Sequence, residues 1–373
     1  MFPFGSLDKP IVGLDIGTSA IKAVELRGSG RKWSLHRIGW KALPPKAVTG
    51  GKVKDKEVVV QALRELWTEA RIGCKRVAIG VGGQSVILKR IPLALMSEMD
   101  LEDQLALEAE EHIPFDIEEV YLDFQILERG AEQMEVLLAA CKKELVDNRL
   151  EATREAGLNP VLCDLDLFSM ANAYDIFSAV GDGQVKHKNT GKSKTTAAPP
   201  EKGEKIPATA LVNAGASHLS VAILVNGLPE STRDHAFGGE RLLQELQQNA
   251  SCSFEEADRM IRLGTDTQGR PWSAESRDPL VQAFLEQMGT LIRQSMDFHL
   301  AGHPNQQITS VQVGGGCAPL AELPDTLESL LNLPVRVITP WSGLHGSLPP
   351  QLDPKNAPGY LVALGLALRG DAP

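Results

Sequence analysis

The sequence predicts an α/β protein of two similar lobes, with a small α+β unit inserted into the first lobe. Three observations support this prediction. The chain has 373 residues, whereas single hydrophobic cores stop growing at roughly 250–300 residues. A strand–turn–strand pattern near residue 15 returns near residue 213, which indicates an internal duplication. Residues 86–157 carry a self-contained pattern of helix, two strands and helix.

The duplicated pattern is a hairpin. Residues 11–26 run from an apolar strand through a short polar turn into a second strand, and residues 210–224 do the same. The repeat predicts that each lobe opens with this hairpin. The aligned pairs are Asp15 and Asn213, Gly17 and Gly215, and Ser19 and Ser217.

The inserted unit has its own helix start and helix end. Ser97 followed by Asp100 is close to a capping box, and Pro114 ends the helix that begins there. Two strands and a second helix are predicted over residues 121–156. The apolar residues of the first helix are expected to be core and not a partner groove; they are Leu101, Leu105 and Ile113.

Composition and charge exclude several classes of protein. The chain has 38 Lys plus Arg against 48 Asp plus Glu, a formal charge of -10, so bulk charge does not attract nucleic acid. The five cysteines are spaced too irregularly for a disulfide framework or a zinc site. No signal-peptide pattern opens the chain, and its apolar stretch at 360–368 is too short to span a bilayer. We expect a cytoplasmic protein without a membrane span.

The first hairpin has the residue types that bind phosphate. Gly17 lets the turn bring backbone N–H groups close to phosphate oxygens, and Thr18 and Ser19 add hydroxyl donors. Asp15 can hold water on a Mg²⁺ ion, and Lys22 brings positive charge to the β- and γ-phosphates. Taken alone, such a turn is more often a plain hairpin than a binding site.

Three further elements strengthen the phosphate-binding interpretation. The second hairpin can clamp the same phosphates from the other lobe. Glycines that open a helix near residue 239 can lie against ribose or phosphate, and the acidic residue after them can accept from ribose hydroxyls. Three glycines after the strand ending at residue 313 let backbone approach a nucleoside. The candidate positions are Asn213, Gly215, Ala216, Ser217, Gly239, Glu240, Gly314, Gly315 and Gly316.

Several stretches have the pattern of one family; they are residues 13–26, 108–115, 120–124, 237–239, 314–316 and 362–370. They resemble the PilM family of actin-like cytoplasmic proteins of type IV pilus assembly. The resemblance covers nearly the whole chain except residues 181–205. The glycine motifs belong to the wider actin, cell-division and heat-shock superfamily, whereas the region around Ile113, Pro114 and Phe115 points to PilM.

The resemblance implies an actin-like, duplicated ribonuclease H-like fold with ATP and Mg²⁺ bound between the lobes, Asp15 holding the metal through water. It also implies a partner, the short N-terminal cytoplasmic peptide of the membrane protein PilN. The peptide site would use the inserted unit and the adjoining lobe. The protein would then be a scaffold recruited to the inner membrane, linking the assembly platform to the pilus motor ATPases.

The resemblance also suggests a division of the chain into segments. Lobe I would comprise a first part, the inserted unit, a return to its core and the closing helix, and lobe II would have a core interrupted by a helical subdomain. The expected segments are 1–85, 86–157, 158–180, a flexible loop at 181–206, 207–240, 241–305, 306–345 and 346–373.

Departures from the family pattern bear on catalysis. Asn213 stands where the second phosphate loop usually has Asp, and Asp166 is the nearest match to a water-orienting Glu. Near Asp258, a lysine that usually flanks the nucleoside is replaced by Ile261. Binding survives these losses more readily than hydrolysis, so we expect ATP to be bound and hydrolysed slowly or not at all.

Other interpretations stay open at this point. An actin-like ATPase that forms filaments and a small-molecule kinase are both compatible with such a fold, although no dedicated substrate motif is evident. His299 and His303 are four residues apart, as metal ligands on a helix would be, but Pro304 follows and no third ligand is evident. We therefore interpret the histidine pair as coincidental.

Overall fold

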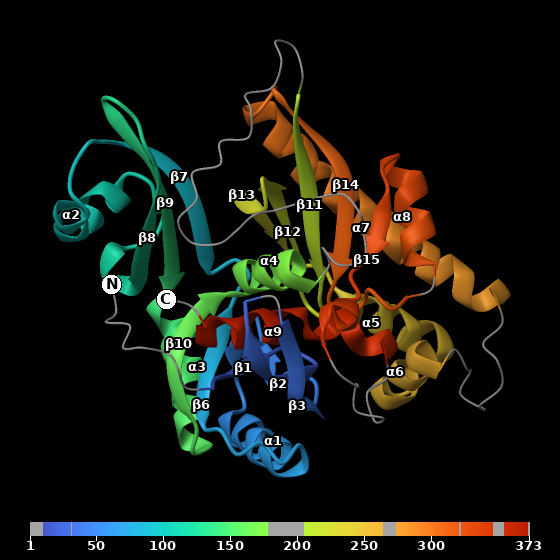
Figure 1. The fold of residues 1–373 in the computed structure, drawn as a ribbon. Coiled ribbons are helices and arrows are strands. Elements are labelled where there is room, and N and C mark those ends of the chain that lie inside the picture. Colours follow the sequence, from blue (N-terminus) through green and yellow to red (C-terminus); the bar gives the residue numbers. More distant parts are fainter. Residues whose placement is uncertain are drawn as a thin grey trace.

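The computed structural model describes residues 10–30, 32–177, 205–263, 274–320, 322–345 and 354–371. Two five-stranded sheets, a three-stranded sheet and a two-stranded ribbon form the described fold, with helices between and around them (Figure 1). The loop predicted at 181–206 lies outside the described residues except for its last two positions, and Ile206 already begins a strand.

The two five-stranded sheets are the centres of lobes I and II. Their strand orders are β3-β2-β1-β6-β10 and β13-β12-β11-β14-β15. The strands of lobe I are β1 (Val12–Ile16), β2 (Ala20–Ser29), β3 (Lys32–Ala42), β6 (Arg76–Val81) and β10 (Asn159–Leu165). Those of lobe II are β11 (Ile206–Ala214), β12 (Leu219–Val225), β13 (Leu228–His235), β14 (Gln306–Gly314) and β15 (Val335–Val337).

The two sheets have the same topology. In each, the first three strands in sequence are antiparallel neighbours, and the remaining two add in parallel on the other side of the first strand. Antiparallel neighbours can be joined by short turns, whereas parallel neighbours need long crossover connections, usually helical. The predicted two-lobed, duplicated α/β fold is confirmed by this match.

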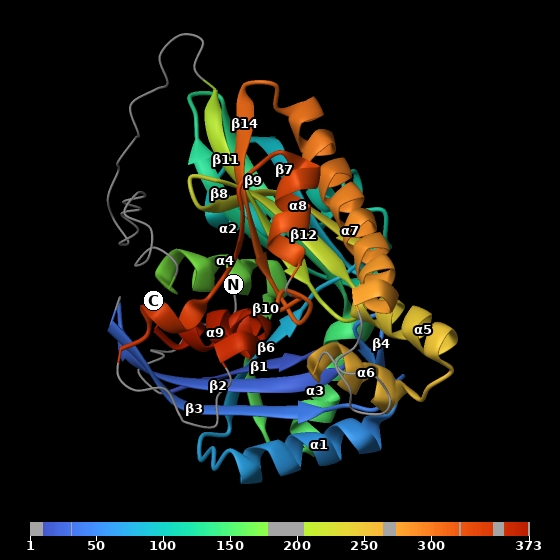
Figure 2. The same ribbon diagram turned by 90° about the vertical axis from the view of Figure 1, so that its right-hand side faces the viewer.

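Two helices lie between the large sheets. α4 (Asp166–Phe177) follows β10, α9 (Leu361–Leu368) lies beyond β15, and the two helices pack against each other (Figures 1 and 2). Every residue of α9 is buried, so this helix has no solvent-facing side. It belongs to a hydrophobic cluster that also contains Val24 of lobe I and Ala222 of lobe II. The lobes therefore share a core through these helices.

The remaining large helices cover the outer faces. In lobe I, α1 (Lys56–Glu69) begins at the capping residue Asp55 and packs along β3. In lobe II, α7 (Ala274–Gly302) crosses the sheet and α8 (Leu323–Leu331) packs beside it (Figure 2). The helices α5 (Gly239–Ala250) and α6 (Phe254–Leu263) complete that lobe.

The inserted unit forms a separate antiparallel sheet of order β7-β9-β8. A capping box of Ser97 and Asp100 starts its first helix, as predicted. Leu101 and Ile113 are buried in the unit's own core and Leu105 is partly buried against it, which confirms their assignment to the core. The elements of this unit are β7 (Val86–Ala94), α2 (Glu98–Glu110), β8 (Val120–Arg129) and β9 (Gln133–Lys142). The helix α3 (Lys143–Glu155), which the sequence pattern places in the same unit, packs mainly against α1 and β10 of lobe I.

Some element ends differ from the sequence pattern for identifiable reasons. The helix α7 begins at Ala274 and continues through Pro279, although proline inside a helix removes one of its backbone hydrogen bonds. The closing helix begins at Leu361, after a 3₁₀ segment over Pro354–Tyr360 that contains Pro358. Across the described residues, no helix is both long enough and apolar enough to cross a membrane.

Two glycines allow the central helices to approach their neighbours closely. A Cβ atom added at Gly365 would lie 1.7 Å from the carbonyl oxygen of Ser169 in α4. One added at Gly13 in β1 would lie 1.9 Å from the carbonyl oxygen of Ala363 in α9. Any side chain at either position would therefore force backbone segments apart.

We expect Gly365→Ala to lower the free energy of unfolding by about 1–3 kcal/mol, because α4 and α9 must separate to admit the methyl group. Gly302→Ala is the matched control, since nothing lies within 4 Å of its added Cβ; its effect should stay below about 0.5 kcal/mol. Urea denaturation followed by circular dichroism measures both variants. Equal unfolding midpoints would contradict the close packing of α9 on α4.

Candidate functional site

The two duplicated hairpins have the same turn geometry. In the first, Asp15 pairs with Lys22 across the strands, and the Gly17 N–H donates to the Ala20 carbonyl at 3.1 Å. In the second, Asn213 pairs with Ser220. Its turn closes in the same way, with the Gly215 N–H donating to the His218 carbonyl at 2.9 Å. The sequence repeat thus corresponds to a repeat of three-dimensional structure.

The tips of the two hairpins meet between the lobes. The Thr18 hydroxyl of lobe I and the Ser217 hydroxyl of lobe II are 2.7 Å apart and hydrogen-bonded. Among the backbone hydrogen bonds of the described residues, none uses the N–H groups of Thr18, Ser19, Ala216 or Ser217 as donors. Hydroxyl and amide donors from both lobes are therefore gathered at one point, which is the arrangement that binds an anion.

One cation lies beside the first tip. The Lys22 ammonium donates to Asp15 Oδ2 at 2.9 Å, and both side chains are largely buried. A Cβ added at Gly17 would lie 3.6 Å from Lys22 Nζ and 3.8 Å from Asp15 Oδ1. The missing side chain at Gly17 leaves room beside both charges. A phosphate there would meet the ammonium directly, while the carboxylate stays close enough to act on a hydrated cation.

The start of helix α5 is hydrogen-bonded to the turn of the second hairpin. The N–H groups of Gly239 and Glu240 donate to the carbonyls of Gly215 and Ala216 at 3.1 and 2.8 Å. The Gly239 N–H, expected to meet a nucleoside, is thus engaged in holding the hairpin turn. The Glu240 carboxyl stays available as an acceptor, and partial burial raises its pKa.

The three glycines after β14 differ in their surroundings. A Cβ at Gly314 would lie 2.3 Å from Leu361 Cδ1, so its small size serves packing against α9. Gly315 adopts a φ of +93° and donates its N–H to the Pro358 carbonyl at 2.8 Å. Only Gly316 of the three has nothing within 4 Å of an added Cβ. Gly316 is therefore the one with space to approach a ligand.

Asp166 begins α4 and lies against the end of β6. A Cβ at Gly82 would be 2.7 Å from Asp166 Oδ2, so glycine is needed there for the carboxyl to fit. Its Oδ1 is buried and has no hydrogen-bond partner among the described residues. Burial raises the pKa of Asp166 to about 7, with Arg149 acting in the opposite direction and Asp15 adding to the rise.

Sequence reasoning missed two polar residues near the second tip. His218 Nδ1 is 2.8 Å from the Ser217 hydroxyl, and a Cβ at Gly83 would lie 3.5 Å from His218 Nε2. Asp234 accepts from the Ser220 hydroxyl. His218 lies inside the repeated hairpin, directly after Ser217, and was therefore open to detection from the sequence. Asp234 had no local signal, because strand pairing between β12 and β13 brings it beside Ser220.

The described residues contain no group of three His, Cys, Asp or Glu side chains placed to hold a metal ion. The pair His299 and His303 stacks ring on ring at 4.3 Å. His299 is hydrogen-bonded to Ser231 at 2.8 Å and to Gln306 at 2.7 Å, so the pair belongs to a structural network. A Mg²⁺ ion that keeps most of its waters needs few protein ligands, so a single carboxylate such as that of Asp15 would suffice to hold one through water.

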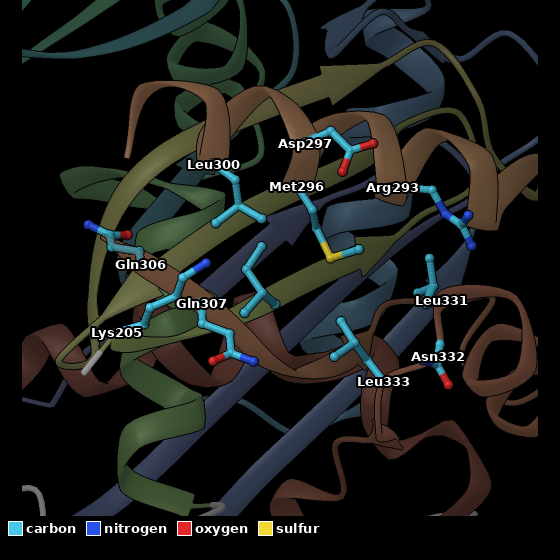
Figure 3. Close-up of a pocket in the computed structure, with 11 residues that line it drawn as sticks. Lys205, Arg293, Met296, Asp297, Leu300, Gln306, Gln307, Leu331, Asn332 and Leu333 are labelled. Carbon is cyan, nitrogen blue, oxygen red and sulfur yellow. The ribbon is translucent and has the colours of Figure 1, made fainter. Parts of the chain in front are cut away.

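A cavity of about 600 Å³ in lobe II lies among α7, the start of β14 and the α8–β15 connection (Figure 3). Its lining is partly apolar and contains none of the predicted phosphate-binding residues. The labelled residues are Lys205, Arg293, Met296, Asp297, Leu300, Gln306, Gln307, Leu331, Asn332 and Leu333.

Comparison with solved structures supports the fold assignment. A chain of a "PilM-PilN type IV pilus biogenesis complex" is 26% identical, with a TM-score of 0.76 and coverage of 98% of this chain and 99% of that chain. The ethanolamine utilization protein EutJ from Carboxydothermus hydrogenoformans is 17% identical, with a TM-score of 0.54 and coverage of 98% and 91%. MreB5 of Spiroplasma citri bound to ADP is 12% identical, with a TM-score of 0.50 and coverage of 97% and 96%.

These similarities confirm the predicted actin-like fold. Residues 13–371 also match the family model described as "Type IV pilus assembly protein PilM", which spans both lobes and the inserted unit. The chain belongs to the PilM family of type IV pilus assembly proteins.

Proposed function

We propose that this chain is an ATP-binding scaffold of type IV pilus assembly that binds a PilN-type N-terminal peptide. The observation that carries the proposal is the full-length similarity, at 26% identity, to a chain of a PilM–PilN complex. Family membership over residues 13–371 supports the same role. Through its partner the scaffold is recruited to the inner membrane, where it links the assembly platform to the motor.

The nucleotide site lies where the two hairpin tips meet. Lys22, the hydroxyls of Thr18 and Ser217 and the tip amides hold the phosphates, and Asp15 orients the water shell of Mg²⁺. Of the other predicted positions, Gly316 and Glu240 are assigned to contact with the nucleoside. Gly239, Gly314 and Gly315 are engaged in turn or packing contacts and shape the backbone around it.

The peptide site lies on the inserted unit, within the proposed segment 86–157. Among described residues, half of the eight exposed large hydrophobic side chains belong to this small part of the chain. Its exposed apolar residues are Leu95, Met99, Leu107 and Tyr121. A bound peptide would cover part of this apolar surface, as partner proteins cover apolar patches that are contiguous.

A contact between the inserted unit and lobe II offers a route for coupling. Arg90 of β7 forms an ion pair with Glu230 of β13 at 3.1 Å, and Gln306 donates to the other Glu230 oxygen at 2.7 Å. When ATP changes the separation of the lobes, this ion pair carries the change to the sheet that holds the peptide. ATP binding then acts by changing the contact with the peptide, and no chemical product is needed.

Hydrolysis in this scaffold is slow or absent. Asn213 places no negative charge near the metal, and it occupies the position that would complete a carboxylate pair with Asp15. Asp166 is the other candidate for catalysis; burial raises its pKa to about 7, so a catalytic role for this carboxyl would make hydrolysis depend on pH around neutrality.

Lys22→Ala is expected to weaken ATP binding by about tenfold to a hundredfold, because a charge-assisted hydrogen bond to phosphate is worth about 1.5–3 kcal/mol. Isothermal titration calorimetry with Mg²⁺-ATP measures the affinity. Lys54→Ala removes an exposed lysine of the same lobe and serves as the control. Unchanged affinity in Lys22→Ala would contradict the phosphate site.

A synthetic PilN-type N-terminal peptide should protect backbone amides of residues 86–157 from hydrogen–deuterium exchange, read out by mass spectrometry. The reason is that a bound peptide covers the exposed apolar surface of the inserted unit. A scrambled peptide is the control, and each is measured with and without Mg²⁺-ATP. Protection confined to lobe II, or equal protection by the scrambled peptide, would contradict the assignment.

Phosphate release from Mg²⁺-ATP should stay low and flat between pH 6 and pH 8. An Asp166 that activated water would lose its proton in this interval and raise the rate by about tenfold. Asp166→Asn should therefore leave the rate within about twofold of the unmodified protein. A rapid, Mg²⁺-dependent rate that rises with pH and disappears in Asp166→Asn would show that the protein is an ATPase.

A further inference from the structure

A cavity of about 630 Å³ lies at the end of the lobe I sheet opposite the hairpin tips. Glu25, which lines it, pairs with Val12 at the start of β1, whereas the first hairpin turn follows the end of β1 at Ile16. The rest of the lining comes from β2, β3, the connection between α1 and β6, the first residues of β6 and β10, and the chain just before β1. The cavity is therefore separate from the nucleotide site.

Five cationic side chains line this cavity, although the whole chain has a net charge of -10. They come from separate segments of lobe I and are Arg27, Arg37, Arg71, Lys75 and Arg76. Within the described residues, none of them forms an ion pair within 4.0 Å. Cations that gather around a hollow without partner carboxylates create a positive potential that attracts anions.

The lining also contains one acidic residue and one histidine. Glu25 is buried, and its Oε1 lies 4.0 Å from His36 Nε2. Burial lowers the pKa of His36, and the nearby Arg27 and Arg37 lower it further while Glu25 opposes them. The imidazole therefore experiences the positive field of the cavity, and its resonances can report on any anion that enters.

Part of the cationic lining is already held in place. Arg37 donates from Nη1 to the His36 carbonyl at 3.0 Å and from Nε to the Arg71 carbonyl at 3.3 Å. Arg71 itself adopts a φ of +53°, in the left-handed region. These contacts restrict the Arg37 guanidinium in part before any ligand arrives, which lowers the entropy lost on binding.

One donor in the cavity is unsatisfied. Arg76 Nε is buried and has no hydrogen-bond partner among the described residues. Leaving a buried donor unpaired costs about 1–3 kcal/mol, and more for a charged group. The Nε atom itself has almost no exposed surface, so the guanidinium attracts an anion through its charge at the cavity wall. Planar guanidinium groups match the oxygens of phosphate in paired hydrogen bonds.

We propose that this cavity binds a small phosphorylated ligand. Its phosphoryl group accepts from Arg76 and the cations around it, and Glu25 accepts from a hydroxyl or amino group of the same ligand. The volume lies in the range of small-molecule sites, about 300–1,000 Å³. A doubly charged phosphate balances a lining of five cations better than a single carboxylate does. This site would allow a phosphorylated compound to act on the scaffold independently of ATP.

The test uses two probes, inorganic phosphate and glucose 6-phosphate, titrated into the full chain at constant ionic strength. Imidazole proton–carbon correlation spectra follow His36, assigned by comparison with His36→Gln. Because His36 lines this cavity, its signals report binding there even when phosphate also reaches the nucleotide site. We expect saturable shifts of His36 with glucose 6-phosphate, and an upward shift of its pKa when the ligand is bound.

The double variant Arg37→Ala/Arg71→Ala removes two exposed cationic side chains from the lining. It should weaken ligand binding by about tenfold or more, since a loss of about 1.4 kcal/mol in binding free energy raises the Kd tenfold. Lys75→Glu is a second variant that reverses one charge at an exposed position. Lys54→Ala, an exposed lysine outside the cavity, and Lys22→Ala in the nucleotide site are the controls and should not change the His36 titration. Unfolding midpoints verify that each variant is folded.

A third arm separates soluble from lipid-borne phosphate. Vesicles of phosphatidylcholine with and without phosphatidic acid are sedimented with the protein. Co-sedimentation that requires phosphatidic acid and is lost in the double variant would assign the phosphate to a lipid headgroup. If the protein does not co-sediment but binds glucose 6-phosphate saturably, the phosphate belongs to a soluble ligand. His36 shifts that stay linear with probe concentration, or that saturate equally in the double variant, would overturn the proposal.

Discussion

The packing of α4 against α9 between the two sheets is the contact on which the rest of the structure depends. Both helices are in a single hydrophobic cluster with residues of both lobes, so neither lobe completes its core alone. Gly365 lies against the Ser169 carbonyl of α4, which leaves no room for a side chain. The separation of the lobes, and with it the distance between the hairpin tips, follows from this contact.

The same arrangement explains how a scaffold can respond to a nucleotide. The hairpin tips meet through Thr18 and Ser217, one from each lobe, so a phosphate bound there contacts both. Lobe II also contacts the inserted unit through Arg90 and Glu230. We propose that a change at the tips reaches the sheet proposed to hold the peptide through this ion pair. The cationic cavity lies beyond the opposite end of β1, where a second ligand would leave the tips untouched.

Much of this fold was accessible from the sequence because its signals are local. The capping box of Ser97 and Asp100 marks a helix start, and the aligned hairpins at Asp15 and Asn213 predict two related lobes. Glycine was a less reliable guide to the site. The sequence pattern predicts that Gly314 faces a ligand, but in the structure its small size makes room for Leu361 of α9. Sequence cannot distinguish a glycine that admits a ligand from one that admits a neighbouring side chain, because both have the same local pattern.

The sequence by itself determined the duplication, the inserted unit and the identity of the residues at the first hairpin, since each depends on spacing within a short stretch of chain. Tertiary structure decided which distant groups meet. Asp234 reaches the second hairpin only through pairing of β12 with β13, and Asp166 acquires a raised pKa only through burial beside Gly82. The cationic cavity likewise assembles Arg27, Arg37 and Arg76 from separate strands. Burial and long-range juxtaposition depend on the packing of the whole chain, which no local pattern contains.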